Sequence, residues 1–349
     1  MSKQEKIKSF NPNNIALHNS GIFGLPFNYK ESELVILPLP WDVTVSYNDG
    51  TANAPEDVFQ ASKQVDLFDP AVPNAWQAGL LMLPINKKWH KQSKQIRKIA
   101  KQVIADLESN KVTATTNKSL LKINNACQQF HNAVEDETLQ HINNNKIVIG
   151  LGGDHSTPYG IIKALATKHK SFGILQFDAH CDLRNAYEGF QYSHASIMYN
   201  IINNIPQVKK LTQVGIRDYC QDEVDIIDQS NGKINVFFDR TLKQKSYIGT
   251  TFALQTAQII STLPNKVYIS FDIDALDPKL CPNTGTPVAG GLELEQAVYI
   301  IEQLVQAKKV IIGADINEIG TSNTDWDANV GARLLFRLTN LIAMSNKII

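Results

Sequence analysis

The sequence predicts an α/β protein in which helices cover both faces of a mostly parallel sheet. From residue 147 to the end of the chain, short apolar runs alternate with longer segments whose apolar residues recur at helical spacing. This alternation is typical of strands that are joined by crossover helices and therefore pair in parallel. Neither a linker nor an internal repeat interrupts the pattern, so residues 33–349 are expected to form one domain.

The predicted strands are short runs rich in Val, Ile and Leu. The first of them contains Pro38 and is followed by Pro40, and proline either ends a strand or places it at a sheet edge. The predicted strands are residues 34–39, 147–151, 172–177, 211–216, 234–238, 266–274 and 309–316.

The predicted helices carry apolar residues three or four positions apart. In that period His131 and His141 fall on positions expected to be exposed. A polar extension on the surface is expected over residues 1–32, a loop over 41–54 and irregular structure over 70–91. The predicted helices are residues 56–63, 92–109, 118–143, 158–169, 194–204, 251–263, 293–307 and 329–343.

Composition and charge argue against several classes of protein. The 34 basic and 34 acidic residues balance, and no basic stripe indicates a nucleic-acid partner. No apolar run approaches the ~20 residues that span a membrane. The charged N-terminus lacks the apolar core of a signal peptide, so a cytoplasmic location is expected. The four cysteines form no CxxC pair and indicate no disulfide framework.

A polar cluster follows the predicted strand 172–177. Asp178, His180 and Asp182 stand two positions apart, and side chains at this spacing leave an extended segment on the same side. Burying such groups without partners is costly, so the cluster indicates either a metal site or a solvated polar loop. Cys181 faces the other way by the same alternation and is expected to serve packing.

Two further clusters follow other predicted strands. Gly152–Ser156 presents His155 at the end of strand 147–151, although its Asp154 also suits a helix cap. Asp272 and Asp274 stand two positions apart at the end of a strongly apolar strand. In a parallel α/β sheet, ligands bind beyond the carboxyl ends of the strands, where all these residues fall.

The residue types in these clusters indicate two metal ions. Oxygen donors dominate, which favours Mn²⁺ over a tetrahedral structural Zn²⁺. Six donors are too many for one catalytic ion with an open position, whereas they suit two ions that share carboxylates. A water held between the ions would lose a proton near neutral pH. The candidate ligands are His155, Asp178, His180, Asp182, Asp272 and Asp274.

The motifs GGDHS, DAHCD and SFDIDALDP, in this order and spacing, resemble the ureohydrolase family of arginases, agmatinases, formiminoglutamases and guanidino-acid hydrolases. The resemblance covers residues 34–340. It implies a three-layer α/β/α sandwich with a mostly parallel eight-stranded sheet and assembly into trimers or hexamers. It also implies two Mn²⁺ ions whose bridging hydroxide attacks a guanidinium carbon and releases urea.

The resemblance assigns roles to single residues. Asp178 and Asp272 would bridge the ions. Glu318, which follows the strand 309–316, would hold the substrate guanidinium, although it also suits a plain loop acid. His194 would shuttle protons, although it also suits the start of a helix without a role. One ion would take His155, Asp178, Asp182 and Asp272, and the other Asp178, His180, Asp272 and Asp274.

The substrate is indicated by the loop between Asp182 and Ser196. The Ser-Gly-Asn-x-His-Gly segment of arginases is missing, and the loop resembles that of agmatinases, which convert agmatine to putrescine and urea. Glu188 would attract the distal amine of agmatine. Arg184 leaves open a carboxylate-bearing substrate, as in formiminoglutamase, guanidinobutyrase or arginase, or else has a structural role. An inactive metal-binding protein is the alternative from another class.

Overall fold

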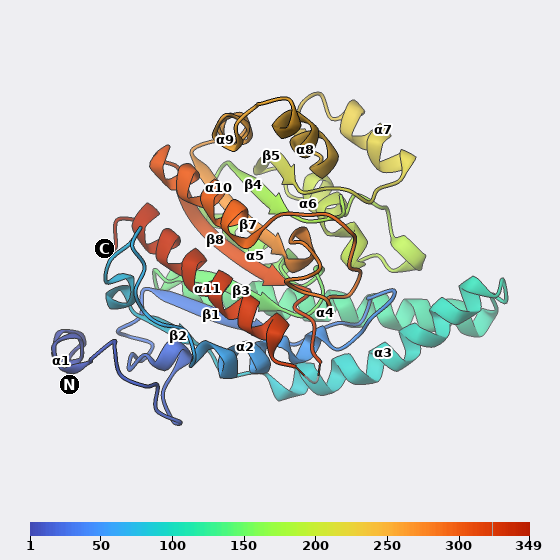
Figure 1. The fold of residues 1–349 in the computed structure, drawn as a ribbon. Helices are drawn as coiled ribbons and strands as arrows, with labels where there is room; N and C mark the ends of the chain where they lie inside the picture. Colours follow the sequence, from blue (N-terminus) through green and yellow to red (C-terminus); the bar gives the residue numbers. More distant parts are fainter. Residues whose placement is uncertain (323) are drawn as a thin grey trace.

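Figure 1 shows the computed structural model of the protein, which describes residues 1–322 and 324–349. Eight strands form a sheet in the order β2-β1-β3-β8-β7-β4-β5-β6, and all pairings are parallel. The predicted α/β/α architecture is confirmed. The strands are β1 (Leu34–Leu39), β2 (Leu80–Met82), β3 (Ile147–Gly152), β4 (Phe172–Phe177), β5 (Val208–Val214), β6 (Ile234–Phe237), β7 (Lys266–Asp272) and β8 (Val310–Asn317).

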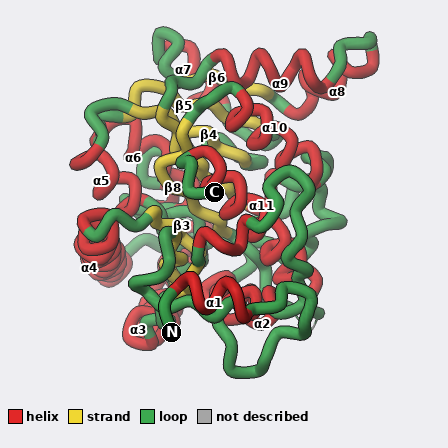
Figure 2. Tube along the Cα trace, turned by 90° about the vertical axis from the view of Figure 1, so that its left-hand side faces the viewer, coloured by secondary structure: helices red, strands yellow, loops and turns green. Residues whose placement is uncertain are grey.

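Each face of the sheet has its own apolar core beneath its own layer of helices. Figure 2 shows α4, α5 and α6 on one side of the strands and α10 and α11 on the other. Leu175 of β4 points into one core and its neighbour Ile174 into the other, which explains why the strands are apolar throughout. The helices are α1 (Lys3–Ser9), α2 (Ala54–Ser62), α3 (Lys87–Glu108), α4 (Ala114–Asn143), α5 (Tyr159–Lys168), α6 (Ile197–Asn204), α7 (Gln221–Gln229), α8 (Asp239–Tyr247), α9 (Phe252–Ser261), α10 (Leu294–Gln306) and α11 (Trp326–Ser345).

The helices α3 and α4 form a long hairpin that projects beyond the sheet (Figure 1). Both begin four or five residues earlier than predicted, because their first turns are mostly polar, with Trp89 of α3 as the exception. Asn86 caps α3 by accepting hydrogen bonds from two N–H groups of the first turn, and Thr113 caps α4. Caps rather than apolar residues therefore set these helix starts.

Some elements were missed by the sequence prediction. Residues 70–91 are not wholly irregular, since they contain the three-residue edge strand β2 and the start of α3. The helices α7 and α8 were not predicted either. Both are short and strongly polar, with few buried residues, so their sequences show little apolar period.

The first strand ends at Leu39, directly before Pro40, as one of the two alternatives predicted, but it is not an edge strand and continues through Pro38. β1 lies between β2 and β3, and Pro38 pairs in register with Leu151. The pairing of β1 with β2 stops at Ile36. Pro38, which has no N–H to donate, therefore lies in the half of β1 that no longer pairs with β2.

The prediction that His131 and His141 are exposed was wrong. His131 is only 2% exposed, because α5 packs closely on this part of α4. Gly160 of α5 makes the approach possible, since a Cβ at this position would lie 2.5 Å from the carbonyl oxygen of His131. His141 is half-buried, and its Nδ1 lies 2.9 Å from the hydroxyl of Tyr29.

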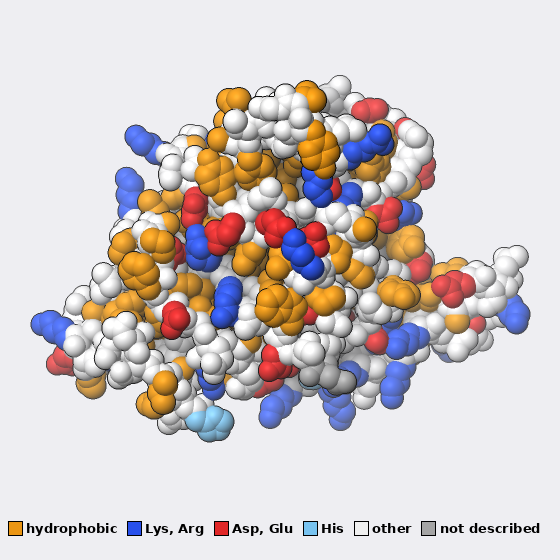
Figure 3. Space-filling model, viewed as in Figure 1, with side chains coloured by type: hydrophobic (Ala, Val, Ile, Leu, Met, Phe, Trp, Pro, Cys, Tyr) orange, Lys and Arg blue, Asp and Glu red, His pale blue; other side chains and the backbone are white. Residues whose placement is uncertain are grey.

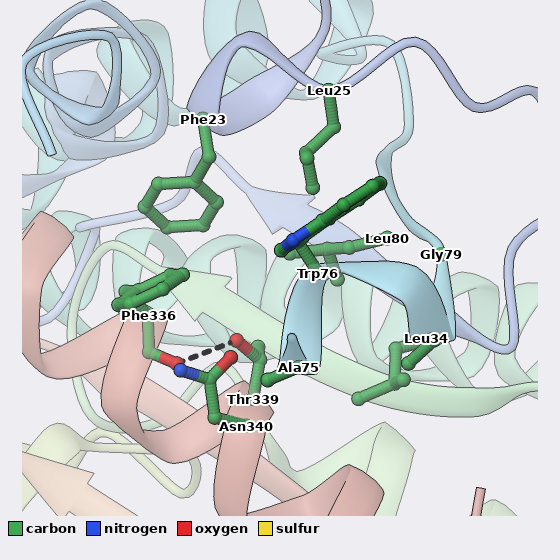
Figure 4. A pocket seen from close by; sticks show the side chains of 11 residues that line it. Phe23, Leu25, Leu34, Ala75, Trp76, Gly79, Leu80, Phe336, Thr339 and Asn340 are labelled. Atoms are coloured by element: carbon green, nitrogen blue, oxygen red, sulfur yellow. Dashed lines mark hydrogen bonds between the residues drawn. The ribbon is translucent and has the colours of Figure 1, made fainter. Parts of the chain in front are cut away.

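Residues 1–32 contain a polar part and an apolar part. Within the second, Phe23 and Leu25 are buried in the core on the α11 side. Phe23 packs on Phe336 with ring centroids 5.4 Å apart, and both line a small cavity beside Trp76 (Figure 4). Apolar contacts thus fasten this segment to the sheet.

The surface mixes charges of both signs. On the face that carries α10 and α11, basic and acidic side chains are interspersed with apolar ones (Figure 3). In the described ranges, no helix combines the length and the apolar character that crossing a membrane requires.

Candidate metal centre

The sheet order brings the three predicted motifs together. β3, β8, β7 and β4 are consecutive neighbours in the middle of the sheet and run in the same direction. Their carboxyl ends therefore meet at one edge, where His155, Asp178, Asp272 and Glu318 follow. No single motif determines the order of the strands in the sheet. The sequence therefore predicted that these residues converge, but the distances between them come only from the structure.

The first cluster of donor atoms surrounds the ring of His155. Its Nδ1 lies 2.9 Å from Oδ2 of Asp178, 2.9 Å from Oδ2 of Asp182 and 3.4 Å from Oδ2 of Asp272. All four side chains are buried. Three carboxylate oxygens thus lie within 3.4 Å of this imidazole nitrogen, and those of Asp178 and Asp182 are also close to each other.

The second cluster lies on the other side of Asp178. Nδ1 of His180 is 3.0 Å from Oδ2 of Asp274 and 3.6 Å from Oδ1 of Asp178. Asp178 therefore turns one oxygen toward each histidine. The groups His155–Asp178–Asp182 and Asp178–His180–Asp274 each have the spacing that a metal ion needs, and they share Asp178.

The chemistry of these donors fits divalent cations. Despite their short separation, Nδ1 of His155 and Oδ2 of Asp182 lack a hydrogen-bond partner anywhere in the described chain. Burial and the negative charge of Asp178 raise the pKa of Asp182 to about 7, and burial and Asp274 raise the pKa of Asp272 well above its usual range. Buried carboxylates that repel one another in this way are stabilised by cations.

Hydrogen bonds fix the carboxylates in place. Gln176 Nε2 donates to Asp178 Oδ2 at 2.7 Å, and the N–H of Ala179 donates to Asp274 Oδ1 at 2.9 Å. Asp182 adopts a left-handed backbone with φ of 55°, a conformation that non-glycine residues rarely adopt. The polypeptide therefore holds its donor set by contacts outside the two clusters.

A buried polar chain lies behind His155. Nε2 of the ring is 2.9 Å from Oγ of Ser270, which donates to Asp315 Oδ1 at 3.1 Å. Burial raises the pKa of Asp315 to about 6. Ser270 and Asp315 orient the ring so that Nδ1 faces the carboxylates. Both residues lie within predicted strands, but the sequence motifs gave no reason to select them as site residues.

Glu318 lies next to the first cluster. Its Oε1 accepts a hydrogen bond of 2.9 Å from the N–H of His155, whereas Oε2 is buried and lacks a donor among residues 1–322 and 324–349. Gly285 leaves room for this oxygen, since a Cβ there would lie 2.8 Å from it. Burial and the charge of Asp154 raise the pKa of Glu318 well above its usual range.

A second network positions His194. The N–H of His194 donates to Thr44 Oγ1 at 3.1 Å, and that hydroxyl donates to Asp154 Oδ2 at 3.1 Å. Asp154 is therefore not the cap of the next helix, which begins at Tyr159 without a side-chain cap. Burial and then the charge of His180 lower the pKa of His194, so its ring is neutral near pH 7.

Arg217 is a structural clamp that lies outside the sequence motifs. Its guanidinium donates to the carbonyl oxygens of Asp274 at 2.7 Å and Leu276 at 3.2 Å, and its N–H donates to Ala179 at 2.8 Å. It also reaches Val288. Arg217 thereby joins the segment after β4 to the segment after β7. The sequence feature that could have identified Arg217 is its position directly after the predicted strand 211–216.

Arg184 lies beside Tyr187 of its own loop and Glu223 of α7. Its Nε lies 3.9 Å from Oε2 of Glu223, and its guanidinium carbon lies 4.9 Å from the ring centroid of Tyr187. Glu223 is buried and also accepts the N–H of Leu183. Arg184, whose side chain is 39% exposed, thus has a buried acid within ion-pair range. Cys181 is fully buried in the core, as the alternation predicted.

Solved structures resemble this fold along its whole length. The agmatine ureohydrolase of Thermoplasma volcanium superposes with a TM-score of 0.70 at 21% identity and covers 99% of both chains. A hypothetical agmatinase from Burkholderia thailandensis gives a TM-score of 0.71 at 22% identity, with 96% of this chain and 93% of the other covered. The fold is thus shared with both proteins.

Curated relatives and a family model agree with this likeness. An N(1)-aminopropylagmatine ureohydrolase of Thermococcus kodakarensis is 30% identical, with 88% of this chain and 90% of the relative covered. An agmatinase of Pyrococcus horikoshii is 27% identical, with 90% and 93% covered. The model described as Arginase family matches residues 32–340. The chain therefore belongs to the arginase family and is a hydrolase, as the sequence predicted.

Proposed function

We propose that this hydrolase binds two Mn²⁺ ions and cleaves agmatine to putrescine and urea. The observation that carries the proposal is the pair of histidine–carboxylate clusters that share Asp178. One ion would bind His155, Asp178, Asp182 and Asp272, and the other Asp178, His180, Asp272 and Asp274. Bound in this way, the ions would lower the pKa of a water molecule and supply the nucleophile near neutral pH.

Glu318 and His194 supply the remaining chemistry in this proposal. A carboxylate oxygen without a donor in the described structure can accept two N–H groups of a planar guanidinium, which orients its carbon toward the clusters. The positive charge of the substrate favours the ionised form of Glu318. His194, neutral at rest, can take a proton and pass it to the leaving amine.

A substrate with a cationic tail is supported over one with a carboxylate. The Glu223 carboxylate and the Tyr187 ring already engage Arg184, which is the residue that would attract a carboxylate. The names of the relatives support two substrates, agmatine and N1-aminopropylagmatine, both of which have amines beyond the guanidinium. Formiminoglutamate, guanidinobutyrate and arginine form the alternative group.

A urea-release panel tests the proposal. Purified protein loaded with Mn²⁺ is assayed with agmatine, N1-aminopropylagmatine, arginine and guanidinobutyrate, and formiminoglutamate is followed by its own product. We expect agmatine or its aminopropyl derivative to give the highest kcat/KM. If only a carboxylate-bearing compound reacts, the substrate assignment is wrong. Bound metal without turnover of any compound would identify an inactive metal-binding protein.

The Arg184→Ala variant separates the two substrate groups. Because Arg184 lies against Tyr187 and Glu223, its loss is expected to change kcat/KM for agmatine by less than about threefold, within the range of a surface ion pair. For a carboxylate-bearing substrate, the KM would instead rise about tenfold or more.

We further propose a cytoplasmic location and assembly into a trimer or hexamer. Light scattering during size-exclusion chromatography tests the assembly.

A further inference from the structure

The loop after the first cluster is fastened to the helical hairpin. Asn124 of α4 donates to the carbonyl oxygen of Gly189 at 3.1 Å and accepts the N–H of Gln191 at 2.8 Å. Phe190 between them is fully buried. Glu188 immediately precedes Gly189. Helix α4 therefore holds the backbone on the C-terminal side of Glu188.

The backbone on either side of Glu188 is strained. Ala186, Glu188 and Gly189 all adopt left-handed conformations, with φ of 49°, 55° and 78°. Only the glycine does so without cost. Strained backbone that surrounding contacts hold in place is concentrated at functional sites. Here the left-handed turn determines where the side chain of Glu188 points.

One oxygen of the Glu188 carboxylate, Oε2, lacks a hydrogen-bond partner in the described chain. This oxygen is shielded from water. Arg97 is the cation whose charge bears on it; its guanidinium donates to the carbonyl oxygen of Val43 at 3.3 Å, and its Nε, 3.6 Å from Asp49, makes no hydrogen bond in the described chain. A shielded carboxylate oxygen without a donor is costly, and a bound ligand that donates a hydrogen bond removes that cost.

The loop that carries Glu188 passes close to His194. The ring of the preceding residue, Tyr187, is 6.4 Å from the ring of His194. Arg97, in the middle of α3, is a cation whose charge acts on both Glu188 and His194. A substrate whose guanidinium contacts Glu318 would therefore extend its far end past His194 toward this loop.

We propose that Glu188 binds the ammonium group at the far end of the guanidino substrate. This inference rests on the proposed function and names the group that selects its substrate class. An ammonium donates charge-assisted hydrogen bonds to a carboxylate and matches the unpartnered oxygen of Glu188. Because Arg184 lies beside the buried Glu223, we assign the tail to Glu188, whose charge also repels substrates that end in a carboxylate.

Steady-state kinetics of Glu188→Gln test the inference. The variant keeps the shape of the side chain and removes its charge. We expect the KM for agmatine to rise about tenfold to a hundredfold with kcat little changed, and the KM for butylguanidine, which has no amine, to stay the same. Glu108→Gln is the matched control, because Glu108 is a neighbouring acid that is exposed at the end of α3.

Equal changes for agmatine and butylguanidine, or none for agmatine, would overturn the inference. Calorimetry with 1,4-diaminobutane on the Mn²⁺-loaded protein gives a second readout that needs no turnover. The diamine should bind the wild type and Glu108→Gln with the same affinity and Glu188→Gln at least about tenfold more weakly. If the wild type hydrolyses no guanidino compound, the proposed function fails while the diamine still tests Glu188.

Discussion

Two histidines in the centre of this protein are equally buried and have opposite surroundings. His155 is 1% exposed and faces Asp178 and Asp182, whereas His131 is 2% exposed and packs among aromatic rings. The centroid of its ring lies 4.8 Å from that of Tyr192. Neither nitrogen of His131 has a hydrogen-bond partner in the part of the chain that the structure describes.

The difference shows that burial alone does not make a functional histidine. Burial lowers the pKa of His131 to about 3, so this ring is a neutral packing group. Burial also acts to lower the pKa of His155, but the carboxylates of Asp178 and Asp182 outweigh it and raise the pKa well above its usual value. Of the two histidines, only His155 therefore has negative charges beside it that could also bind a metal ion.

The largest expected effect is the loss of His155. His155→Asn removes the nitrogen donor at the centre of the first cluster. We expect urea release to fall by more than about 100-fold, which exceeds the loss expected for a residue that only supports a metal ligand. The paired variant His131→Phe should keep wild-type kcat/KM. If the two variants lose activity equally, the contrast between the two environments is wrong.

Metal removal should act on stability as well as on activity. Without cations, the carboxylates of Asp178, Asp182 and Asp272 repel one another, so chelation with EDTA is expected to abolish urea release and lower the Tm. At a Mn²⁺ concentration 100 times the Kd, each bound ion contributes about 2.7 kcal/mol, equal to several degrees in Tm for a chain of this size. Scanning calorimetry with and without Mn²⁺ measures this shift, and His155→Asn should show a smaller one.

Weakening the Arg217 clamp should affect the second cluster. A lysine cannot bond Asp274, Leu276 and Val288 at once, so Arg217→Lys is expected to weaken binding of one of the two ions by about tenfold. Mn²⁺ titration followed by activity measures this change. The exposed Arg240→Lys is the control. Unchanged Mn²⁺ affinity in Arg217→Lys would mean that the clamp does not position Asp274.

The smallest effect concerns His131 and pH. Between the folded pKa of about 3 and the unfolded value near 6.5, the unfolded chain binds one more proton, so this residue lowers stability as the pH falls through that window. From pH 7.5 to pH 5 the loss is about 2 kcal/mol. His131→Phe should remove that part, which urea unfolding at both pH values measures. An unchanged difference between the two pH values would contradict a neutral buried His131.

Much of the site could be predicted because period-two spacing and strand ends are local properties. Asp178, His180 and Asp182 stand at alternate positions after an apolar run, and the structure brings them together with His155 and Asp274. Their roles as ligands stay predictions until metal is measured.

Other features depend on contacts between distant segments and were not predictable. Arg217 bonds carbonyl oxygens, which any residue type provides, so no sequence pattern marks its partners. The burial of His131 depends on the close approach of α5 at Gly160. The left-handed backbone of Glu188 depends on contacts with α4, and the helix starts of α3 and α4 depend on polar caps.

The central claim is that two ions share Asp178, and a metal count combined with electron paramagnetic resonance tests it most directly. Protein loaded with Mn²⁺ and freed of excess metal should hold two ions per chain and give the spectrum of an exchange-coupled pair, since a shared carboxylate links them. Asp178→Asn should weaken or abolish the coupling. One ion per chain, or two with the spectrum of isolated Mn²⁺, would contradict the account.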